Sequence, residues 1–424
     1  MRPLAALLRA QLAASGPISI ADYMGLCLQH PQHGYYRTRD PLGAAGDFTT
    51  APEIHQMFGE LIGLWLAQVW QDQGAPAPFL LAELGPGRGT LMADILRATR
   101  GVPGFHAAAR IALVETSEAL RRAQAERLAD HGPLWCSEVT EIPEGPLFLM
   151  ANEIFAALPI RQFQRDGARW RERRVGLGAD RLTIGLSPPL PMSGLETLEP
   201  DVPDGKVVEH CPGAEPIAAE LGRRIAEEGG AALVIDYGSW RGTGDTFQAL
   251  RGHRMVDPLD APGSADLTAH VRFADLARWS GLRASALTGQ GVFLERLGIT
   301  ARAQALLRAG AGEAELIAAH RRLTHPDEMG TLFKVLGLAG SQHPPQPAHE
   351  GRATGSRTPG SPTRGYRRAR PRGPSGGWVR AISRSVPIRS ARTKDAQQPA
   401  PMVWAHRVRA GRAEASLLSS PQAD

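Results

Sequence analysis

Cysteine is scarce in this sequence: only Cys27, Cys136 and Cys211 occur among 424 residues, and no two of them form a Cys-x-x-Cys pair. This spacing indicates neither a disulfide framework nor a zinc site. The 13 histidines form no His-Glu-x-x-His motif, so we expect no bound metal. The phosphate-binding motif Gly-x-x-x-x-Gly-Lys-Ser/Thr is also absent, which argues against an NTPase.

Long apolar runs are absent as well, so the sequence predicts no membrane span. Residues 1–19 resemble a weak signal peptide, but Arg9 interrupts the apolar run and the leucines repeat at helical spacing. We therefore expect this segment to form a surface helix of the folded protein, and we expect a cytoplasmic location.

Charge is distributed unevenly along the chain. Residues 341–424 hold 15 of the 48 basic and 4 of the 43 acidic residues, a net charge of +11. This tail is rich in Arg, Pro, Gly and Ser, which predicts disorder. A basic tail can bind nucleic acid, but an accidental extension of the reading frame gives the same composition. Residues 1–340 carry 33 basic and 39 acidic residues, a net −6, so we expect no nucleic-acid partner for the body.

The stretch AELGPGRGTL, residues 82–91, places Gly85, Gly87 and Gly89 within five positions. The apolar run before it predicts a buried strand, and apolar residues at helical spacing after it predict a helix. Strand, glycine turn and helix open a nucleotide-binding α/β unit, because the backbone can approach the ligand and the helix N-terminus offers free N–H groups. The alternative is a plain glycine turn between a core strand and a helix.

Two details favour S-adenosyl-L-methionine over NAD as the ligand. A dinucleotide fingerprint has its third glycine three residues after the second, where this chain has Thr90. Glu83 would repel a pyrophosphate and favours a cationic ligand. Glu115 ends a second predicted strand, residues 111–114, where an acid is placed to accept both ribose hydroxyls. The same acid is also placed to cap a helix that begins near Ser117.

Strands and helices continue to alternate along the body. We expect further strands at residues 147–151, 231–235, 284–287 and 332–336, with helices at about 217–225 and 273–279. Alternating segments after residue 160, separated by turn residues, are typical of an antiparallel meander. This order predicts an α/β fold with a mostly parallel, doubly wound, seven-stranded sheet closed by an antiparallel strand.

Several phrases spread over the chain resemble one known family. They are GPISIADYM, HPQHGYY, GDFTTAPEI, FGELIGLW, LGPGRGTL, ANEIFAALPIRQF, VIDYG, ADLTAHVRF and MGTLFKVL, between about residues 17 and 338. Together they resemble the MidA-type class I methyltransferases, which include the mitochondrial complex I assembly methyltransferase. The glycine motif marks only the superfamily, whereas the GDFTTAPE and ANE phrases are specific to the family.

The resemblance implies a class I methyltransferase with a Rossmann-like fold, S-adenosyl-L-methionine as cofactor, and a protein arginine as acceptor. The substrate would be a protein, with a respiratory complex I subunit as a candidate. We expect a helical extension over residues 1–75 that covers the active site and a cofactor-binding domain over 76–340. A β-meander is inserted in that domain at about 160–215, and the basic tail follows at 341–424. The residues expected to bind the cofactor are Glu83, Gly85, Gly87, Gly89 and Glu115.

Asn152, Glu153 and Asp47 are the candidate catalytic residues. Glu153 follows a predicted strand at the edge where open α/β sheets hold their active crevice, and a carboxylate can grip two N–H groups of a guanidinium. Asp47 is placed to close over that crevice. The plainer alternatives are a helix cap for Glu153 and an Asx turn for Asp47. Family members usually carry an acid three residues after Glu153, where this chain has Ala156, and this departure weighs against arginine as the acceptor.

The leading hypothesis is therefore a protein arginine N-methyltransferase linked to respiratory complex assembly. The alternative from another class is a non-catalytic assembly factor that retains the cofactor-binding fold. A nicotinamide-dependent dehydrogenase is disfavoured by Thr90 and Glu83. Transfer of a labelled methyl group to a protein separates the first hypothesis from the second.

Overall fold

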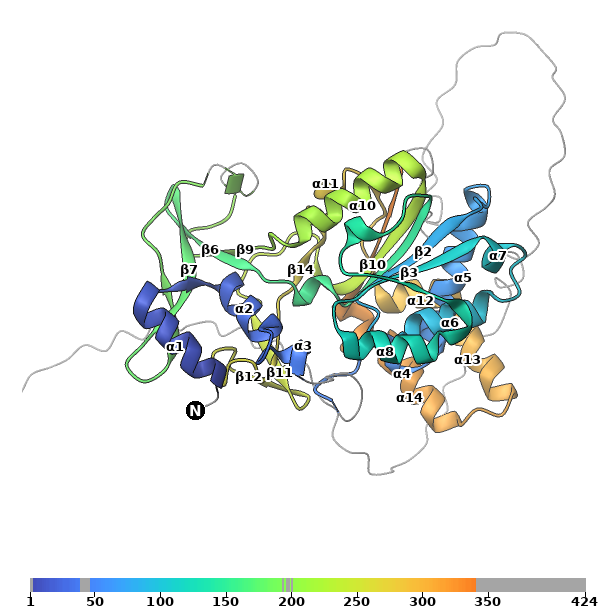
Figure 1. Ribbon diagram of the computed structural model, residues 1–424, viewed down its shortest axis with the longest axis horizontal. Coiled ribbons are helices and arrows are strands. Elements are labelled where there is room, and N and C mark those ends of the chain that lie inside the picture. The colour runs from blue at the N-terminus through green and yellow to red at the C-terminus, as the bar shows by residue number, and fades with distance from the viewer. Residues whose placement is uncertain (1–2, 39–45, 193, 196–198, 200, 341–424) are drawn as a thin grey trace, which may run out of the picture. The chain divides into compact units, whose positions relative to one another are not determined.

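The computed structural model describes residues 3–38, 46–192, 194–195, 199 and 201–340 (Figure 1). The chain divides into two units after Gly373, and every described residue belongs to the first. The basic tail predicted at residues 341–424 lies outside the described residues.

A mixed sheet forms the centre of the cofactor-binding part. Its strands are β2 (Phe79–Leu84), β3 (Ala109–Val114), β4 (Leu134–Cys136), β5 (Leu147–Asn152), β10 (Gly230–Ser239), β15 (Arg283–Ala284) and β17 (Phe333–Ala339). They lie in the order β15-β17-β10-β5-β2-β3-β4, with β17 antiparallel to both of its neighbours and the other pairs parallel. The predicted doubly wound sheet with an antiparallel closing strand is confirmed.

Alternate residues of the central strands pack on opposite faces of this sheet. In β2, Phe79 and Leu81 belong to one apolar cluster and Leu80, Ala82 and Leu84 to another. Both faces are buried, which is why these strands are continuous apolar runs in the sequence. The first cluster is covered by α5 (Met57–Asp72), α6 (Thr90–Thr99), α12 (Gln290–Leu297), α13 (Ile299–Arg308) and α14 (Glu313–Thr324), and the second by α10 (Ala214–Glu228) and α11 (Phe273–Ser280) (Figure 1).

The N-terminal extension and the predicted meander form a second packed region. The extension contains α1 (Pro3–Ser15), β1 (Ile18–Ser19), α2 (Ile20–Gln29), α3 (Tyr35–Thr38) and α4 (Ala51–Ile54), of which α4 packs in the first apolar cluster instead. The meander contains β6 (Arg161–Asp166), β7 (Arg169–Leu177), β8 (Leu182–Leu186) and β9 (Val207–His210), and β1 pairs antiparallel with β7. A third, small sheet was not anticipated from the sequence: β12 (Arg254–Val256), β11 (Gln248–Arg251) and β13 (Asp266–Thr268), in that order.

One strand prediction needs correction. A continuous strand was expected at residues 284–287, but the chain forms β15, leaves the sheet, and returns as β16 (Thr288–Gly289). Both pieces pair with β17, and the Ser285 hydroxyl accepts a hydrogen bond from the Gly337 amide between them at 2.9 Å. The Ser285 amide still donates to the Gly337 carbonyl oxygen at 2.8 Å, so the side chain takes over only one of the two backbone bonds here, which a propensity pattern does not reveal. A further short strand, β14 (Val271–Arg272), pairs with β10.

The remaining elements are short. They are α7 (Phe105–Ala108), α8 (Glu118–Arg127), the 3₁₀ turns Ala129–His131, Val139–Glu141 and Phe155–Ala157, and a π-helical turn at Pro326–Gly330. None of the helices in the described ranges is long and apolar enough to cross a bilayer.

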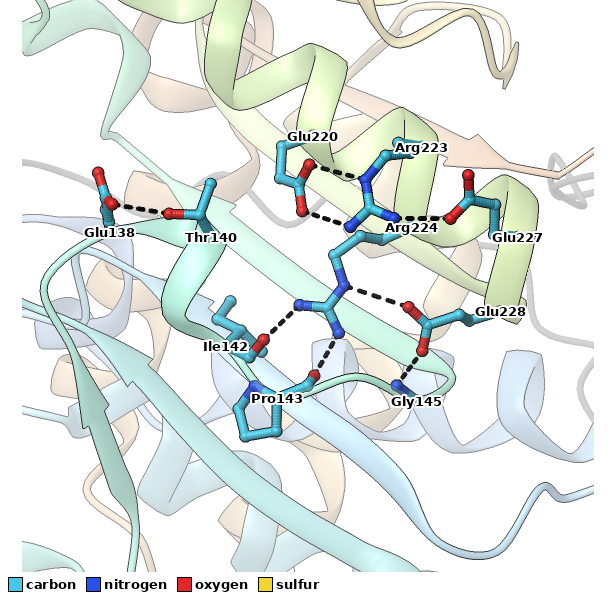
Figure 2. Close-up of polar contacts among 10 residues, drawn as sticks. All are labelled: Glu138, Thr140, Ile142, Pro143, Gly145, Glu220, Arg223, Arg224, Glu227 and Glu228. Carbon is cyan, nitrogen blue, oxygen red and sulfur yellow. Dashed lines mark hydrogen bonds and ion pairs between the residues drawn. The ribbon is translucent and has the colours of Figure 1, made fainter.

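A buried arginine fixes α10 to the chain that leads into β5. Arg224 is 1% exposed, and its guanidinium donates to the carbonyl oxygens of Ile142, at 2.7 Å, and Pro143 (Figure 2). Glu228, one turn later, pairs with Arg224 at 3.6 Å and accepts a hydrogen bond from the Gly145 amide. Because β5 begins at Leu147, this anchor sets the start of the strand whose other end carries Asn152.

Candidate active site

The sheet reverses its winding between β2 and β5, which are parallel neighbours. Open α/β sheets form a crevice at the carboxyl ends of the strands at such a point. The glycine loop follows β2 there, and Asn152 and Glu153 end and follow β5. The fold thus brings together two of the segments that the sequence predicts to be functional.

The glycine loop needs its glycines for conformation and for space. Gly85, Gly87 and Gly89 all have positive φ, at 60°, 54° and 77°. A Cβ on Gly85 would lie 2.7 Å from Cδ1 of Ile154, the residue after Glu153. Residues other than glycine rarely adopt a positive φ, so a substitution at any of these three positions would strain the backbone of the loop.

A buried glutamine supports the loop from the opposite side. Gln124 of α8 is fully buried, and its amide donates to the Gly87 carbonyl oxygen at 2.7 Å. The Trp135 indole donates to the Gln124 carbonyl oxygen at 2.8 Å and so fixes the orientation of that amide. Sequence reasoning missed both residues, because neither belongs to a local motif around the glycines.

Glu83 carries an unsatisfied buried oxygen beside this loop. The residue is 3% exposed, and its Oε2 has no hydrogen-bond partner among the described residues. Burial raises the pKa of Glu83 to about 8, although the Met92 amide bonds the carboxylate and opposes the shift. An acid held this way gains a partner when a cationic group binds, which fits the ammonium of an amino-acid moiety.

Glu115 contacts the N-terminal end of α8. Its Oε1 accepts the Ser117 amide at 2.7 Å, while Ser117 itself caps α8 by accepting the Leu120 amide at 3.4 Å. Burial raises the pKa of the Glu115 carboxyl, and bonds from the Ser117 and Thr116 amides oppose this. The Gln124 side chain adds a hydrogen bond to this carboxylate, so Glu115 is held beside the glycine loop that Gln124 supports.

Glu153 is held in an unusual backbone conformation at the end of β5. Its φ is 56°, and its amide donates to the Ile235 carbonyl oxygen of the neighbouring strand at 2.8 Å. Oε1 accepts the Ala51 amide at 3.0 Å and the Asn152 side-chain amide at 3.2 Å. Burial raises the pKa of Glu153 to about 7. No described residue donates to Oε2, so one oxygen is fixed and the other can bind a ligand.

Asn152 adds a second unsatisfied atom at this edge of the sheet. Its amide nitrogen is committed to Glu153, but its Oδ1 is buried and has no hydrogen-bond partner within the described part of the chain. A buried amide oxygen without a donor is costly, so a ligand N–H or hydroxyl is the natural partner.

Asp236 shapes the loop that follows Glu153. It is fully buried, and its Oδ2 accepts the Ala156 amide at 3.0 Å while Oδ1 accepts the Tyr237 amide at 2.9 Å. Burial raises the pKa of Asp236 to about 8, and the negative charge of Glu153 adds to the shift. With both oxygens occupied by backbone, Asp236 positions the loop and does not offer a free oxygen to a ligand.

Asp47 makes hydrogen bonds to other segments of the chain that the sequence does not reveal. Oδ2 accepts the Tyr35 hydroxyl at 2.7 Å, and Oδ1 accepts the Gly252 amide at 2.7 Å. The Asp47 carbonyl oxygen also accepts the His253 amide. These bonds join the extension to the β11–β12 turn, so the geometry favours a positioning role for Asp47 and not the Asx turn.

The extension also reaches the cofactor loop. The Thr90 hydroxyl, at the first position of α6, donates to Glu53 of α4 at 2.5 Å. Arg37 of α3 donates to the Thr116 carbonyl oxygen, beside Glu115, at 3.4 Å. Thr90, the residue that stands in place of a third glycine, therefore links the loop to the extension.

Comparison with known proteins agrees with this geometry. Residues 61–290 match the model of a family described as S-adenosyl-L-methionine-dependent methyltransferases. The chain belongs to this family. The mitochondrial protein arginine methyltransferase NDUFAF7 of Danio rerio is 38% identical over 78% of this chain and 85% of its own length. The Homo sapiens protein of the same name is 36% identical over 79% and 83%.

A solved structure supports the fold and the cofactor of this methyltransferase. A protein from Burkholderia thailandensis, crystallised with S-adenosyl-homocysteine, has a TM-score of 0.68 and 27% sequence identity. The alignment covers 79% of this chain and 91% of that one. The predicted fold class, the methyltransferase activity and the cofactor are confirmed, and the dehydrogenase alternative is not supported.

The names of the relatives contradict one prediction. A cytoplasmic location was expected, whereas the curated relatives are named as mitochondrial. The cytoplasmic prediction is therefore wrong. It rested on the N-terminal segment, which forms α1 and buries Leu4, Leu8 and Leu12 against the extension. Burial of a helix reports its packing and does not report the compartment of the protein.

A second acid near Glu153 was not identified from the sequence. Asp266 of β13 is 6% exposed, and its Oδ1 accepts the Tyr36 hydroxyl at 2.7 Å. Both residues lie in phrases that carry the family resemblance, ADLTAHVRF and HPQHGYY, but they are 230 positions apart. Only the folded chain shows that they meet.

Proposed function

We propose that this methyltransferase transfers a methyl group to arginine side chains of a protein, with Glu153 gripping the guanidinium. The observation that carries the proposal is the geometry of Glu153: Oε1 is fixed by the Ala51 amide and the Asn152 side chain, and Oε2 is left to a ligand. The naming of the curated relatives as protein arginine methyltransferases supports it.

The bound cofactor supplies an activated sulfonium methyl group close to this edge of the sheet. Glu83, the glycine loop and Glu115 would hold the cofactor, with the unpartnered Oε2 of Glu83 suited to its ammonium group and Glu115 to its ribose hydroxyls. An arginine is protonated in water and is a poor nucleophile. A carboxylate that binds its N–H groups orients the reacting nitrogen and localises positive charge away from it.

Proton balance also assigns a role to Glu153. As the new N–C bond forms, the C–S electron pair passes to sulfur, and the guanidinium nitrogen must lose one proton. Glu153 binds that N–H group, and burial places its pKa at about 7, close to the pH at which it can accept a proton. A cationic acceptor that enters the site lowers this pKa again and so favours the ionised carboxylate.

The acceptor protein that the known relatives favour is a subunit of a respiratory complex. Support comes from the mitochondrial naming of the relatives and from the resemblance to a complex I assembly methyltransferase. Mass spectrometry of the respiratory complexes, purified from cells with and without the enzyme, tests this. A methylated arginine that disappears with the enzyme supports the assignment, and its absence from every subunit contradicts it.

The activity itself is tested with peptides that differ only by an arginine-to-lysine exchange. We expect labelled methyl to appear on the arginine peptide alone. Glu153→Gln keeps the shape but removes the charge, and because misplaced reactants can cost about a hundredfold, kcat/KM should fall by at least that factor. Glu144→Gln, an exposed change near the opposite end of β5, serves as the matched control. Transfer to lysine, or full activity of Glu153→Gln, would refute the proposal.

A further inference from the structure

Position 156, where the family usually carries an acid, offers no carboxylate in this chain. The Ala156 side chain is 3% exposed and packs with apolar residues on the face of the sheet that α10 and α11 cover. Asp236 lies directly beside the same loop, but both of its oxygens accept backbone amides. A guanidinium held at Glu153 must therefore find any second carboxylate on another element.

β13 packs against the loop that follows Glu153. The Ala269 amide, just after the strand, donates to the Ala156 carbonyl oxygen at 2.9 Å. This contact brings Asp266, at the first position of β13, to the same side of the molecule as Glu153. The two carboxylates are close enough that the charge of Asp266 contributes to the raised pKa of Glu153.

Asp266 is oriented by a hydroxyl from the extension. Tyr36 donates to Oδ1 at 2.7 Å, and the ring of Tyr36 packs edge-on against Tyr35, whose own hydroxyl bonds Asp47. One oxygen of Asp266 is thus held by an aromatic donor, in the same way that one oxygen of Glu153 is held by the Ala51 amide.

Neither carboxylate forms an ion pair with a basic side chain of the described residues. Arg322, which pairs with Glu328, opposes the raised pKa of Glu153 through its charge but makes no direct contact with it. Burial raises the pKa of Asp266 to about 6, and the charge of Asp47 adds to the shift. Two neighbouring acids without an ion-paired cation are costly when ionised, and an entering cation removes that cost.

We propose that Asp266, oriented by Tyr36, is the second carboxylate that binds the acceptor guanidinium, and that it takes the place of the acid missing at position 156. The proposal rests on the proposed arginine methyltransferase function and adds the residue that determines its specificity. A guanidinium presents N–H groups on two edges, so two carboxylates from different elements can hold it in one plane.

The test measures KM and kcat for an arginine peptide, together with the affinity for S-adenosyl-homocysteine. Asp266→Asn keeps the shape and removes the charge. Loss of one hydrogen-bonded charge pair should raise the peptide KM about ten- to a hundredfold, with cofactor affinity unchanged. Tyr36→Phe leaves the carboxylate but frees its orientation, so it should raise the KM by a smaller factor. Asp260→Asn, an exposed change in the same segment, should behave as the wild type.

The outcomes separate this proposal from the function on which it rests. If the wild-type enzyme methylates arginine and both Asp266→Asn and Tyr36→Phe keep the wild-type KM, only the role of Asp266 is refuted. If the wild-type enzyme methylates lysine peptides and ignores arginine, both proposals fail. If Asp266→Asn no longer binds S-adenosyl-homocysteine and has lost its fold, Tyr36→Phe decides: a raised KM supports the role of Asp266, and an unchanged KM overturns it.

Discussion

At the residue scale, we expect the addition of a single methyl group to affect cofactor binding most strongly in the glycine loop. Gly85 has a φ of 60° and would bring a Cβ within 2.7 Å of Ile154. Gly167, in the β6–β7 turn, has almost the same φ of 58°, but a Cβ there meets no atom within 4 Å. Alanine at either position carries the strain of the left-handed region, roughly 1–2 kcal/mol.

We therefore predict that Gly85→Ala loses more thermal stability than Gly167→Ala, and that only Gly85→Ala loses cofactor affinity. Calorimetric titration with S-adenosyl-L-methionine should show at least about a tenfold loss of affinity, or ~1.4 kcal/mol, for Gly85→Ala. Gly167→Ala should keep the wild-type affinity. Equal affinities for the two variants would mean that the loop does not line the cofactor site.

Glu115 offers a second comparison at this scale. Glu115→Ala should weaken cofactor binding by the value of hydrogen bonds to a charged group, about 1.5–3 kcal/mol. Ser117→Ala removes only the cap of α8 and should lower the melting temperature without a matching loss of affinity. The prediction fails if both variants lose affinity equally, because Glu115 would then act only through the helix start.

At the scale of elements, the anchor of α10 predicts unequal effects from two adjacent arginines. Arg224→Ala leaves the carbonyl groups of Ile142 and Pro143 and the carboxylate of Glu228 without their buried partner (Figure 2). Removing one partner of a buried pair costs about 3–5 kcal/mol. Arg223→Ala, which breaks exposed pairs with Glu220 and Glu227 on the same helix, should change stability little. Urea unfolding of both variants measures the difference, and similar losses would contradict this account.

The elements also show what the sequence could and could not predict. Apolar runs predict β2, β5 and β10 because these strands are buried on both faces. The split into β15 and β16 was missed because the hydroxyl of Ser285, and not a backbone carbonyl oxygen, accepts the Gly337 amide there. The glycine loop and Glu153 follow directly from local patterns. Gln124 and Asp266 do not, since their roles depend on partners far along the chain.

At the scale of the whole described molecule, the site is assembled from three regions. The central sheet supplies the glycine loop and Glu153, the extension supplies Tyr36 and the Ala51 amide, and the small β11–β13 sheet supplies Asp266. The proposed acceptor site therefore depends on the extension through Tyr36 and the Ala51 amide. This arrangement concentrates buried acids in one place, and their titration should govern how stability depends on pH.

Glu60 is a buried acid whose pKa is lowered, as is usual for a carboxylate paired with basic side chains. Burial raises the pKa of Glu60, but the hydrogen bonds and charges of Arg302 and Arg97 outweigh it, and the pKa is lowered overall. The unfolded chain then binds a proton at Glu60 more readily than the folded chain, so stability falls as pH drops below about 4.5, the ordinary range for glutamate. Glu60→Gln should lower stability at neutral pH and flatten this acid limb in a series of thermal melts.

The pKa values of the acids at the site are shifted in the opposite direction. Burial raises the pKa of Glu83 and Asp236 to about 8, of Glu153 to about 7 and of Asp266 to about 6. Between pH 5 and 8 the folded protein therefore retains protons that the unfolded chain has lost, so unfolding releases protons and raising the pH favours it. The cofactor-free protein should therefore lose stability progressively as the pH rises from 5 to 8. Glu83→Gln should remove part of the slope up to pH 8, whereas the exposed Glu144→Gln should leave it unchanged; a stability that stays level from pH 5 to 8 would show that these acids are ionised in the folded protein.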